Sequence, residues 1–379
     1  MFKRAADKRG DKAALKVERP CPGLVGKAAP PALPEAEWAS WTWQQYYDES
    51  CQVAKALMAT GMEQHGAANI FGFNSPEWFM AEMGAIVAGG KAAGIYPTDT
   101  PEQIAFKAAH SGASVAFLED EAKLAKFTIA AKSLPELKAI VCWGCEPKGS
   151  VEGPEGAEIP VYTWADFKKL GDSITDEQLA ERIAAQKPGH CCALIYTSGT
   201  TGQPKAVMIT HDNILVEAAI AGNEMPGIAC EPEQERVLSY LPLSHVAGML
   251  VDIVMPMHMT ATRPGWMTAY FARAYDLKAG SVGDRLRAVR PTLFLGVPRV
   301  WEKVAEKLKA IGAQTTGIKK SLSTWAKGLS LEHQMNCQLG GDGECQRNAM
   351  QCHAMLACRR AWTCSKMPHA ALLLLVVSA

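Results

Sequence analysis

The sequence has no apolar run long enough to cross a bilayer and no excess of either charge. A membrane-spanning helix needs about 18 consecutive apolar residues, whereas the apolar run at residues 370–377 is only eight residues long. Lys plus Arg and Asp plus Glu number 39 each, so charge favours neither nucleic acid nor an anionic membrane surface as a partner. The first 16 residues are charged and lack an apolar core, so we expect no secretory signal.

The sequence also lacks the spacings of a disulfide framework or a zinc site, although it has 12 cysteines. Cys142 and Cys145 form a single Cys-x-x-Cys pair without a second pair. Cys191 and Cys192 fall in an apolar stretch, where cysteine behaves as a small hydrophobe. We therefore expect free thiols, no bound metal and a cytoplasmic location, with peripheral attachment to a membrane left open. A Cys/His metal site in the tail, with His353 and His369, is the alternative.

Short apolar runs alternate with amphipathic stretches over the first 143 residues. The expected strands are residues 69–73, 92–96, 114–118 and 139–143, and the expected helices are residues 41–60, 77–87 and 100–110. Further along the chain, residues 164–187 are expected to form another helix. This alternation predicts an α/β fold with mostly parallel sheets flanked by helices. Residues 17–40 hold five prolines and are expected to be a loop. No residue of this half has a catalytic pattern, so we interpret it as scaffold.

Residues 192–210 carry the densest chemical signal. Residues 192–196 and 206–210 are apolar or β-type runs. The six residues after the first run combine four hydroxyls with two glycines: Thr197, Ser198, Gly199, Thr200, Thr201 and Gly202. Glycine-exposed N–H groups, hydroxyl donors and the following Lys205 suit the oxygens of a phosphate chain. Pro204 separates Gly202 from Lys205, unlike a Walker loop. We predict a strand–loop–strand phosphate site, and a polar surface turn is the alternative.

The same residues resemble a known family. Residues 196–205, Tyr-Thr-Ser-Gly-Thr-Thr-Gly-Gln-Pro-Lys, are similar to the phosphate-loop signature of the AMP-forming, adenylate-forming enzymes. Residues 241–248, Leu-Pro-Leu-Ser-His-Val-Ala-Gly, resemble that family's next motif. Residues 295–303, Leu-Gly-Val-Pro-Arg-Val-Trp-Glu-Lys, resemble long-chain fatty acyl-CoA synthetases. Residues 42–47, Thr-Trp-Gln-Gln-Tyr-Tyr, resemble their bubblegum-type branch. The resemblance covers residues 35–327.

The resemblance implies the large amino-terminal domain of the acyl-CoA synthetase fold. It also implies a ligase that joins a fatty acid to coenzyme A through acyl-AMP, with ATP and Mg²⁺. Residues 197–202 and Lys205 would hold the β- and γ-phosphates, and His245 would lie beside the reacting carboxylate; a purely structural histidine is the alternative. Arg299 would contact a phosphate or pair with an acid. Met249, Met255, Met257 and Met259 would line an acyl tunnel or form ordinary core.

We divide the chain into a lead (residues 1–34), a partial adenylation domain (35–327) and an atypical Cys-rich tail (328–379) that is expected to be disordered. Three later features of the family have no match here: an aromatic-Gly-x-Thr-Glu motif for adenine and magnesium, a Thr-Gly-Asp for ribose, and a small C-terminal domain with a catalytic lysine. The sequence therefore looks C-terminally truncated. Two alternatives to the ligase stay open: a non-catalytic nucleotide- or partner-binding fragment, and adenylation of another carboxylic acid.

Overall fold

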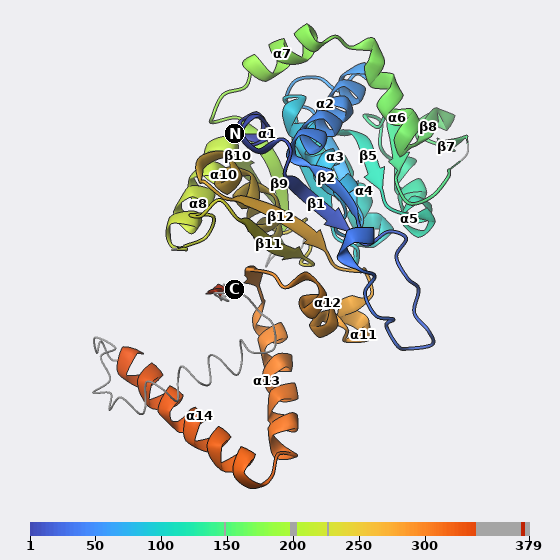
Figure 1. Cartoon of the computed structure of the whole chain (residues 1–379). Coiled ribbons are helices and arrows are strands. Elements are labelled where there is room, and N and C mark those ends of the chain that lie inside the picture. The colour runs from blue at the N-terminus through green and yellow to red at the C-terminus, as the bar shows by residue number, and fades with distance from the viewer. Residues whose placement is uncertain (148, 198–202, 226, 339–372, 376–379) are drawn as a thin grey trace. The chain divides into compact units, whose positions relative to one another are not determined.

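The computed structural model describes residues 1–147, 149–197, 203–225, 227–338 and 373–375 (Figure 1). The chain divides into two compact units, residues 1–291 and 292–379. The first unit holds both extended sheets described below, including the strands that flank the phosphate loop. Within the described part of the chain, no helix combines the length and the apolar character needed to cross a membrane.

The larger sheet has the strand order β10-β9-β4-β3-β5-β6-β8-β7. The six strands from β9 to β8 run parallel, whereas β10 and β7 pair antiparallel at the two edges. The bounds are β3 (Ala67–Phe71), β4 (Lys91–Ile95), β5 (Ala113–Leu118), β6 (Ala139–Cys142), β7 (Ser150–Glu152), β8 (Glu158–Thr163), β9 (Cys191–Thr197) and β10 (Lys205–Thr210). The expected parallel α/β sheet is confirmed.

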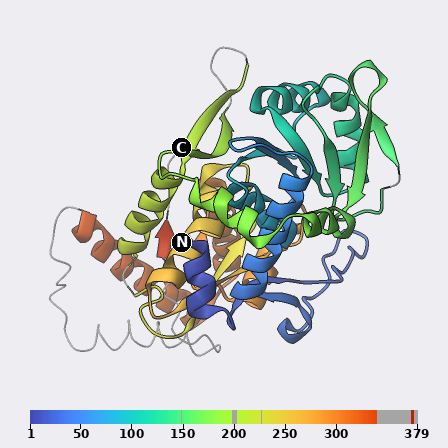
Figure 2. The same ribbon diagram turned by 90° about the horizontal axis from the view of Figure 1, so that it is seen from above.

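A second sheet in the first unit has the order β11-β12-β1-β2, in which only β2 is antiparallel to its neighbour. Its strands are β1 (Ala13–Val17), β2 (Ala39–Thr42), β11 (Gln234–Ser239) and β12 (Trp266–Phe271). Figure 2 shows this sheet from above, beside the larger one. Strand β1 lies inside residues 1–34, where we expected neither a helix nor a strand. Its partner β12 follows some 250 residues later, so a local pattern of five residues could not reveal it.

Helices cover the sheets, and several begin where the sequence predicts a cap. Ser75 caps α3 with Pro76 in the first turn, and Thr100 caps α4 through a capping box. The α-helices of the first unit are α1 (Phe2–Arg9), α2 (Trp43–Ala59), α3 (Pro76–Val87), α4 (Pro101–Ser111), α5 (Glu121–Ala131), α6 (Trp164–Leu170), α7 (Asp176–Ala184), α8 (His211–Asn223), α9 (Val246–Gly248), α10 (Met255–Thr262), α11 (Asp276–Ala279) and α12 (Val282–Val289).

Two boundaries differ from expectation. The helix expected from residue 41 begins at Trp43, because Trp41 is taken into β2 and pairs with Leu15. The single helix expected over residues 164–187 is two helices, α6 and α7. Thr175 is the N-cap of α7 and forms a capping box there. Because an N-cap residue lies outside the helix that it starts, α6 and α7 are not one continuous helix.

The second unit is described by itself. Strand β13 (Leu293–Leu295) pairs in parallel with β14 (Leu373–Leu375), and α13 (Pro298–Ala313) and α14 (Gly317–Gln338) are its helices.

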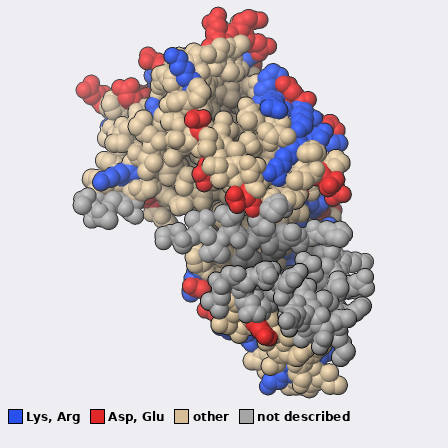
Figure 3. All heavy atoms as spheres, turned by 90° about the vertical axis from the view of Figure 1, so that its left-hand side faces the viewer, with Lys and Arg blue, Asp and Glu red and all other residues tan. Residues whose placement is uncertain are grey.

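On the face of the molecule shown in Figure 3, acidic and basic side chains both occur, with Lys and Arg gathered along one margin. The boundary predicted at residue 327 stays a prediction.

Candidate functional site

The predicted phosphate loop connects two antiparallel strands at the edge of the larger sheet. Thr197 at the end of β9 pairs with Lys205 at the start of β10, and Tyr196 pairs with Ala206. The predicted residues Ser198, Gly199, Thr200, Thr201 and Gly202 lie outside the described residues. Thr197 and Lys205 are exposed at the open end of the strand pair. The two predicted strands that flank the loop are therefore confirmed, and the side chains of Thr197 and Lys205 are both exposed to solvent.

Tyr196 fixes the end of β9 to α4. Its hydroxyl donates to the Lys107 carbonyl (3.0 Å) and lies 3.2 Å from His110 Nδ1. Burial raises the pKa of Tyr196 to about 12, so the phenol remains a neutral donor. The Lys107 ammonium forms a buried ion pair with Asp99 and lies over the Tyr196 ring. The aromatic residue that opens the motif is thus an anchor for the loop.

His245 follows the next strand, β11, and starts a helix. Its Nδ1 accepts a hydrogen bond from the Ala247 N–H (3.1 Å). This contact assigns the proton of the neutral imidazole to Nε2, which leaves Nε2–H as the available donor. The side chain is exposed. His245 therefore has a structural role as a cap, and in addition presents a donor suited to a carboxylate or phosphate oxygen.

Gly94 and Asn74 hold the His245 segment against the larger sheet. A Cβ on Gly94 would lie 2.7 Å from the Ser244 Cα, so only glycine allows this approach. Asn74 Nδ2, just beyond β3, donates to Ser239 Oγ (2.9 Å) and to the Leu241 carbonyl (2.8 Å). Strand β4, which carries Gly94, is the direct neighbour of β9. These contacts bring the segment before His245 to the strand beside the one that leads into the loop.

This site lies at the edge where the parallel strands end, which is the usual ligand side of an open α/β sheet. A family model described as "AMP-binding enzyme" matches residues 2–351. The chain belongs to this AMP-binding enzyme family. The predicted family membership and fold class are confirmed.

Curated relatives in the AMP-binding family are similar to this chain in sequence but are much longer. The long-chain-fatty-acid–CoA ligase ACSBG2 of Xenopus laevis is 45% identical over 296 residues, covering 78% of this chain and 38% of that protein. The ligase ACSBG1 of Homo sapiens is 36% identical over 337 residues, covering 89% of this chain and 42% of that protein. The chain thus spans about two fifths of the length of these relatives.

Solved structures share the fold of this chain. The adenylation domain of a carboxylate reductase from Mycobacterium chelonae matches with a TM-score of 0.64 at 19% identity, covering 87% of this chain and 50% of that one. The anthranilate CoA ligase AuaEII, solved with anthranoyl-AMP, matches with a TM-score of 0.60 at 20% identity, covering 78% of this chain and 49% of that one.

Two buried carboxyl groups, Asp252 and Glu82, were not anticipated from the sequence. Burial raises the pKa of Asp252 to about 8, partly offset by a hydrogen bond from Ser239. Burial likewise raises the pKa of Glu82 to about 8, although the Trp78 indole donates to it (3.2 Å). Ser239, at the end of the strand before His245, therefore has hydrogen bonds with both Asn74 and Asp252. These two contacts hold the strand end in place.

Asp252 lies in a π-helical segment, Met249–Val254, between α9 and α10. The widening has a local cause, because Pro256 has no N–H to donate to the Asp252 carbonyl and its ring clashes there in a regular helix. The sequence therefore contained a sign of this π-helical segment, namely an acid four residues before a proline in an otherwise apolar stretch.

An apolar cavity of about 210 Å³ lies beside this helix. Its walls include Met249 and Met257, together with Met83 of α3, Cys192 of β9 and Ile214 of α8. Met255 and Met259 are buried in the core instead. The methionine cluster therefore divides between a cavity wall and ordinary core.

Other predicted positions have simpler roles. Arg299 is exposed and pairs with Glu302 (2.9 Å), the acid-pairing alternative. Cys142, Cys145, Cys191 and Cys192 are free thiols, as expected. Over the described residues, no three His, Cys, Asp or Glu side chains gather in a way that could hold a metal ion.

Proposed function

We propose that the chain is the ATP- and acid-binding part of a long-chain fatty acyl-CoA ligase. The observation that carries this proposal is the exposed Thr197–Lys205 pair, at the strand ends that flank the Gly- and hydroxyl-rich residues 198–202. The names of the curated relatives supply the substrate class. Lys205 and the loop hold the β- and γ-phosphates, and Nε2–H of His245 contacts the reacting carboxylate.

The proposed chemistry has two balanced steps. A carboxylate oxygen of the fatty acid attacks the α-phosphorus of ATP, and pyrophosphate leaves as acyl-AMP forms. The thiolate of coenzyme A then attacks the acyl carbonyl, and AMP leaves. Positioning and charge stabilisation account for most of the catalysis of such transfers. When bound, Mg²⁺ supplies positive charge to the phosphates. The residues of this chain supply backbone donors, the Lys205 ammonium and an imidazole donor.

The apolar cavity supports a fatty rather than a small polar acid. Met249, which lies four residues after His245 in the chain, lines the cavity. Unbranched thioether side chains adapt to a flexible alkyl chain. We place the alkyl chain here, and propose a cytoplasmic enzyme whose contact with membranes is peripheral.

The test is pyrophosphate release with ATP and palmitate, with benzoate and an amino acid as alternative acids. We expect palmitate-dependent release that His245→Ala reduces. ATP binding without release under any acid identifies the second candidate, a non-catalytic nucleotide-binding fragment. Release with benzoate but not palmitate rejects the fatty acid as substrate.

A further inference from the structure

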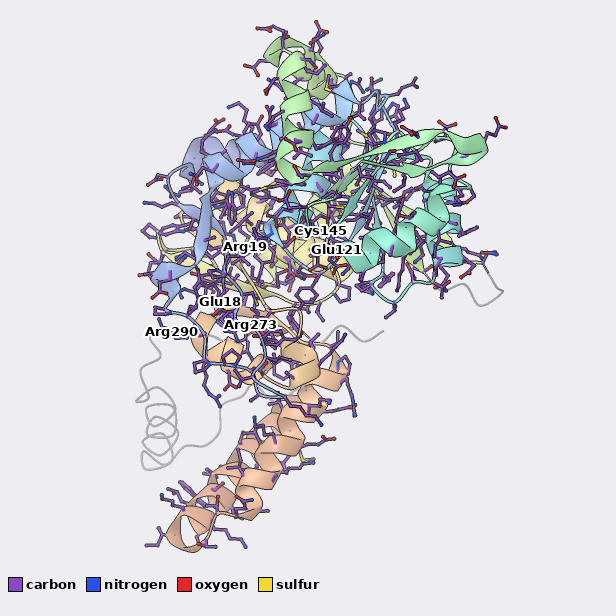
Figure 4. All side chains as sticks on the ribbon, turned by 90° about the vertical axis from the view of Figure 1, so that its right-hand side faces the viewer. Glu18, Arg19, Glu121, Cys145, Arg273 and Arg290 are labelled. Atoms are coloured by element: carbon purple, nitrogen blue, oxygen red, sulfur yellow. The ribbon has the colours of Figure 1, made fainter. Side chains whose placement is uncertain are left out.

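Helix α14 carries large apolar side chains that are exposed to solvent. Ile318 is 88% exposed and Leu331 is 62% exposed. Among the described side chains of α14, the exposed large apolar ones are Ile318, Leu322, Trp325, Leu331 and Met335. Figure 4 shows side chains standing out from the helices of the second unit. Exposed apolar residues that gather on one element mark an interaction surface.

The apolar side chains of α14 form two faces. Ile318, Leu322 and Trp325 follow one another by four and three residues, so they share one face in the first half of the helix. Leu331 and Met335 are four residues apart and form a second face in the other half. Leu331 comes thirteen positions after Ile318, which turns its side chain about 140° around the helix axis. Apolar groups therefore point in two directions from one helix.

The charged side chains of α14 are mostly basic. Its lysines are Lys319, Lys320 and Lys327, against the single acid Glu332, whereas the whole chain has 39 residues of each sign. All three lysines are exposed. Like charges repel, so a second copy of α14 is a poor partner for this helix, and an acidic surface is a good one.

A basic amphipathic helix fits either an anionic membrane surface or an acidic protein groove. A helix that lies on a membrane buries one apolar face and keeps the other side in water, which would leave either Trp325 or Leu331 uncovered. A protein groove that encloses a helix takes apolar anchors from more than one side. The two faces of α14 therefore favour the protein groove.

We propose that α14 is the docking helix for an acidic protein that encloses it in an apolar groove. Ca²⁺-sensor proteins are the class that fits, because Ca²⁺ opens in them an apolar groove rich in methionine. The flexible methionine side chains adapt to irregular anchors. One half of the groove takes the face of Ile318 and Trp325, and the other half takes Leu331 and Met335.

The test is calorimetric titration of the full chain with calmodulin as the probe, once with Ca²⁺ and once with EGTA. We expect a Kd of about 1 μM or tighter with Ca²⁺, and no measurable binding with EGTA because the groove is then closed. The titration contains neither ATP nor a fatty acid. Its outcome is therefore independent of the proposed ligase function.

Two variants probe the two faces separately. Leu322→Glu places a charge on the first face and Leu331→Glu places one on the second, and each should weaken binding about tenfold or more. The matched control is Leu308→Glu, because Leu308 is 60% exposed but belongs to α13. Its affinity for calmodulin should equal that of wild type. Circular dichroism checks that each variant keeps its helix content.

Calcium-dependent binding that both face variants weaken supports the proposal. Absence of binding with Ca²⁺ overturns it, and so does equal weakening by Leu308→Glu, which would show that α14 is not the site. Binding that Leu322→Glu weakens but Leu331→Glu does not would mean contact with one face only, and would also reject the enclosing groove.

Vesicles of phosphatidylserine and phosphatidylcholine test the rival occupant. Vesicle binding that Leu322→Glu abolishes, together with no binding of calmodulin, would assign α14 to a membrane surface and reject the protein groove.

Discussion

Replacing Glu18 by glutamine should destabilise the first unit strongly. The Glu18 side chain is about 1% exposed and pairs with Arg273 and Arg285, whose side chains are 3% and 2% exposed. Its Oε1 also accepts from the Leu33 N–H (2.6 Å), which ties the Pro-rich segment to the sheet. Asp276, bonded to Arg285 (3.1 Å), is the other acid of this cluster.

The size of the effect follows from the charge that is left behind. Glutamine keeps the shape of Glu18 but leaves two buried guanidinium groups with one carboxylate. Removing one member of a buried ion pair costs about 3–5 kcal/mol, a large part of the 5–15 kcal/mol that is typical of total stability. We therefore expect the urea midpoint of unfolding, followed by circular dichroism at pH 7, to fall by about 1–2 M.

The matched control is Glu152→Gln. Glu152 pairs with Lys132, and both side chains are about 60% exposed, so solvent screens this pair and the midpoint should not change measurably. A Glu18→Gln variant that unfolds at the same urea concentration as Glu152→Gln would refute the view that the buried cluster stabilises the fold.

Three further predictions use the same unfolding assay. Burial would raise the pKa of Glu18, but hydrogen bonds from Arg273, Leu33 and Arg285 outweigh it and the pKa is lowered. The contribution of Glu18 to the free energy of unfolding is therefore present above the ordinary carboxyl pKa and is lost as the pH falls. The stabilities of wild type and Glu18→Gln should converge in acid. The raised pKa of Asp252, about 8, makes stability fall between about pH 4 and 8, and Asp252→Asn should flatten that slope; an unchanged slope contradicts this. Gly94→Ala should cost about 1–3 kcal/mol through contact with the Ser244 backbone, whereas the unobstructed Gly189→Ala should cost less; equal costs would contradict the close approach.

The sequence was informative wherever a signal was local. Apolar runs, caps and prolines placed β3, β4 and α3 to within a few residues, because each element is decided by neighbours in the chain. The phosphate-loop strands were predicted for the same reason. Strand β1 was missed because its partners come from β2 and the distant β12, and five residues carry no pattern of their own.

The remainder of the site depends on contacts that no local pattern encodes. The roles of Asn74 and Gly94 come from their approach to the segment before His245, well over 100 residues away. His245 and Lys205 were identified by motif, and their roles toward ligand stay predictions.

The most direct measurement of the central claim is the affinity for ATP of wild-type protein, Lys205→Ala and Lys27→Ala. Lys205 is exposed beside the phosphate loop, and Lys27 is exposed in the Pro-rich segment. A charge-assisted hydrogen bond contributes about 1.5–3 kcal/mol, so Lys205→Ala should weaken ATP binding about ten- to a hundredfold while Lys27→Ala binds as wild type. Equal affinity of all three proteins for ATP would contradict the assignment of this loop to the triphosphate.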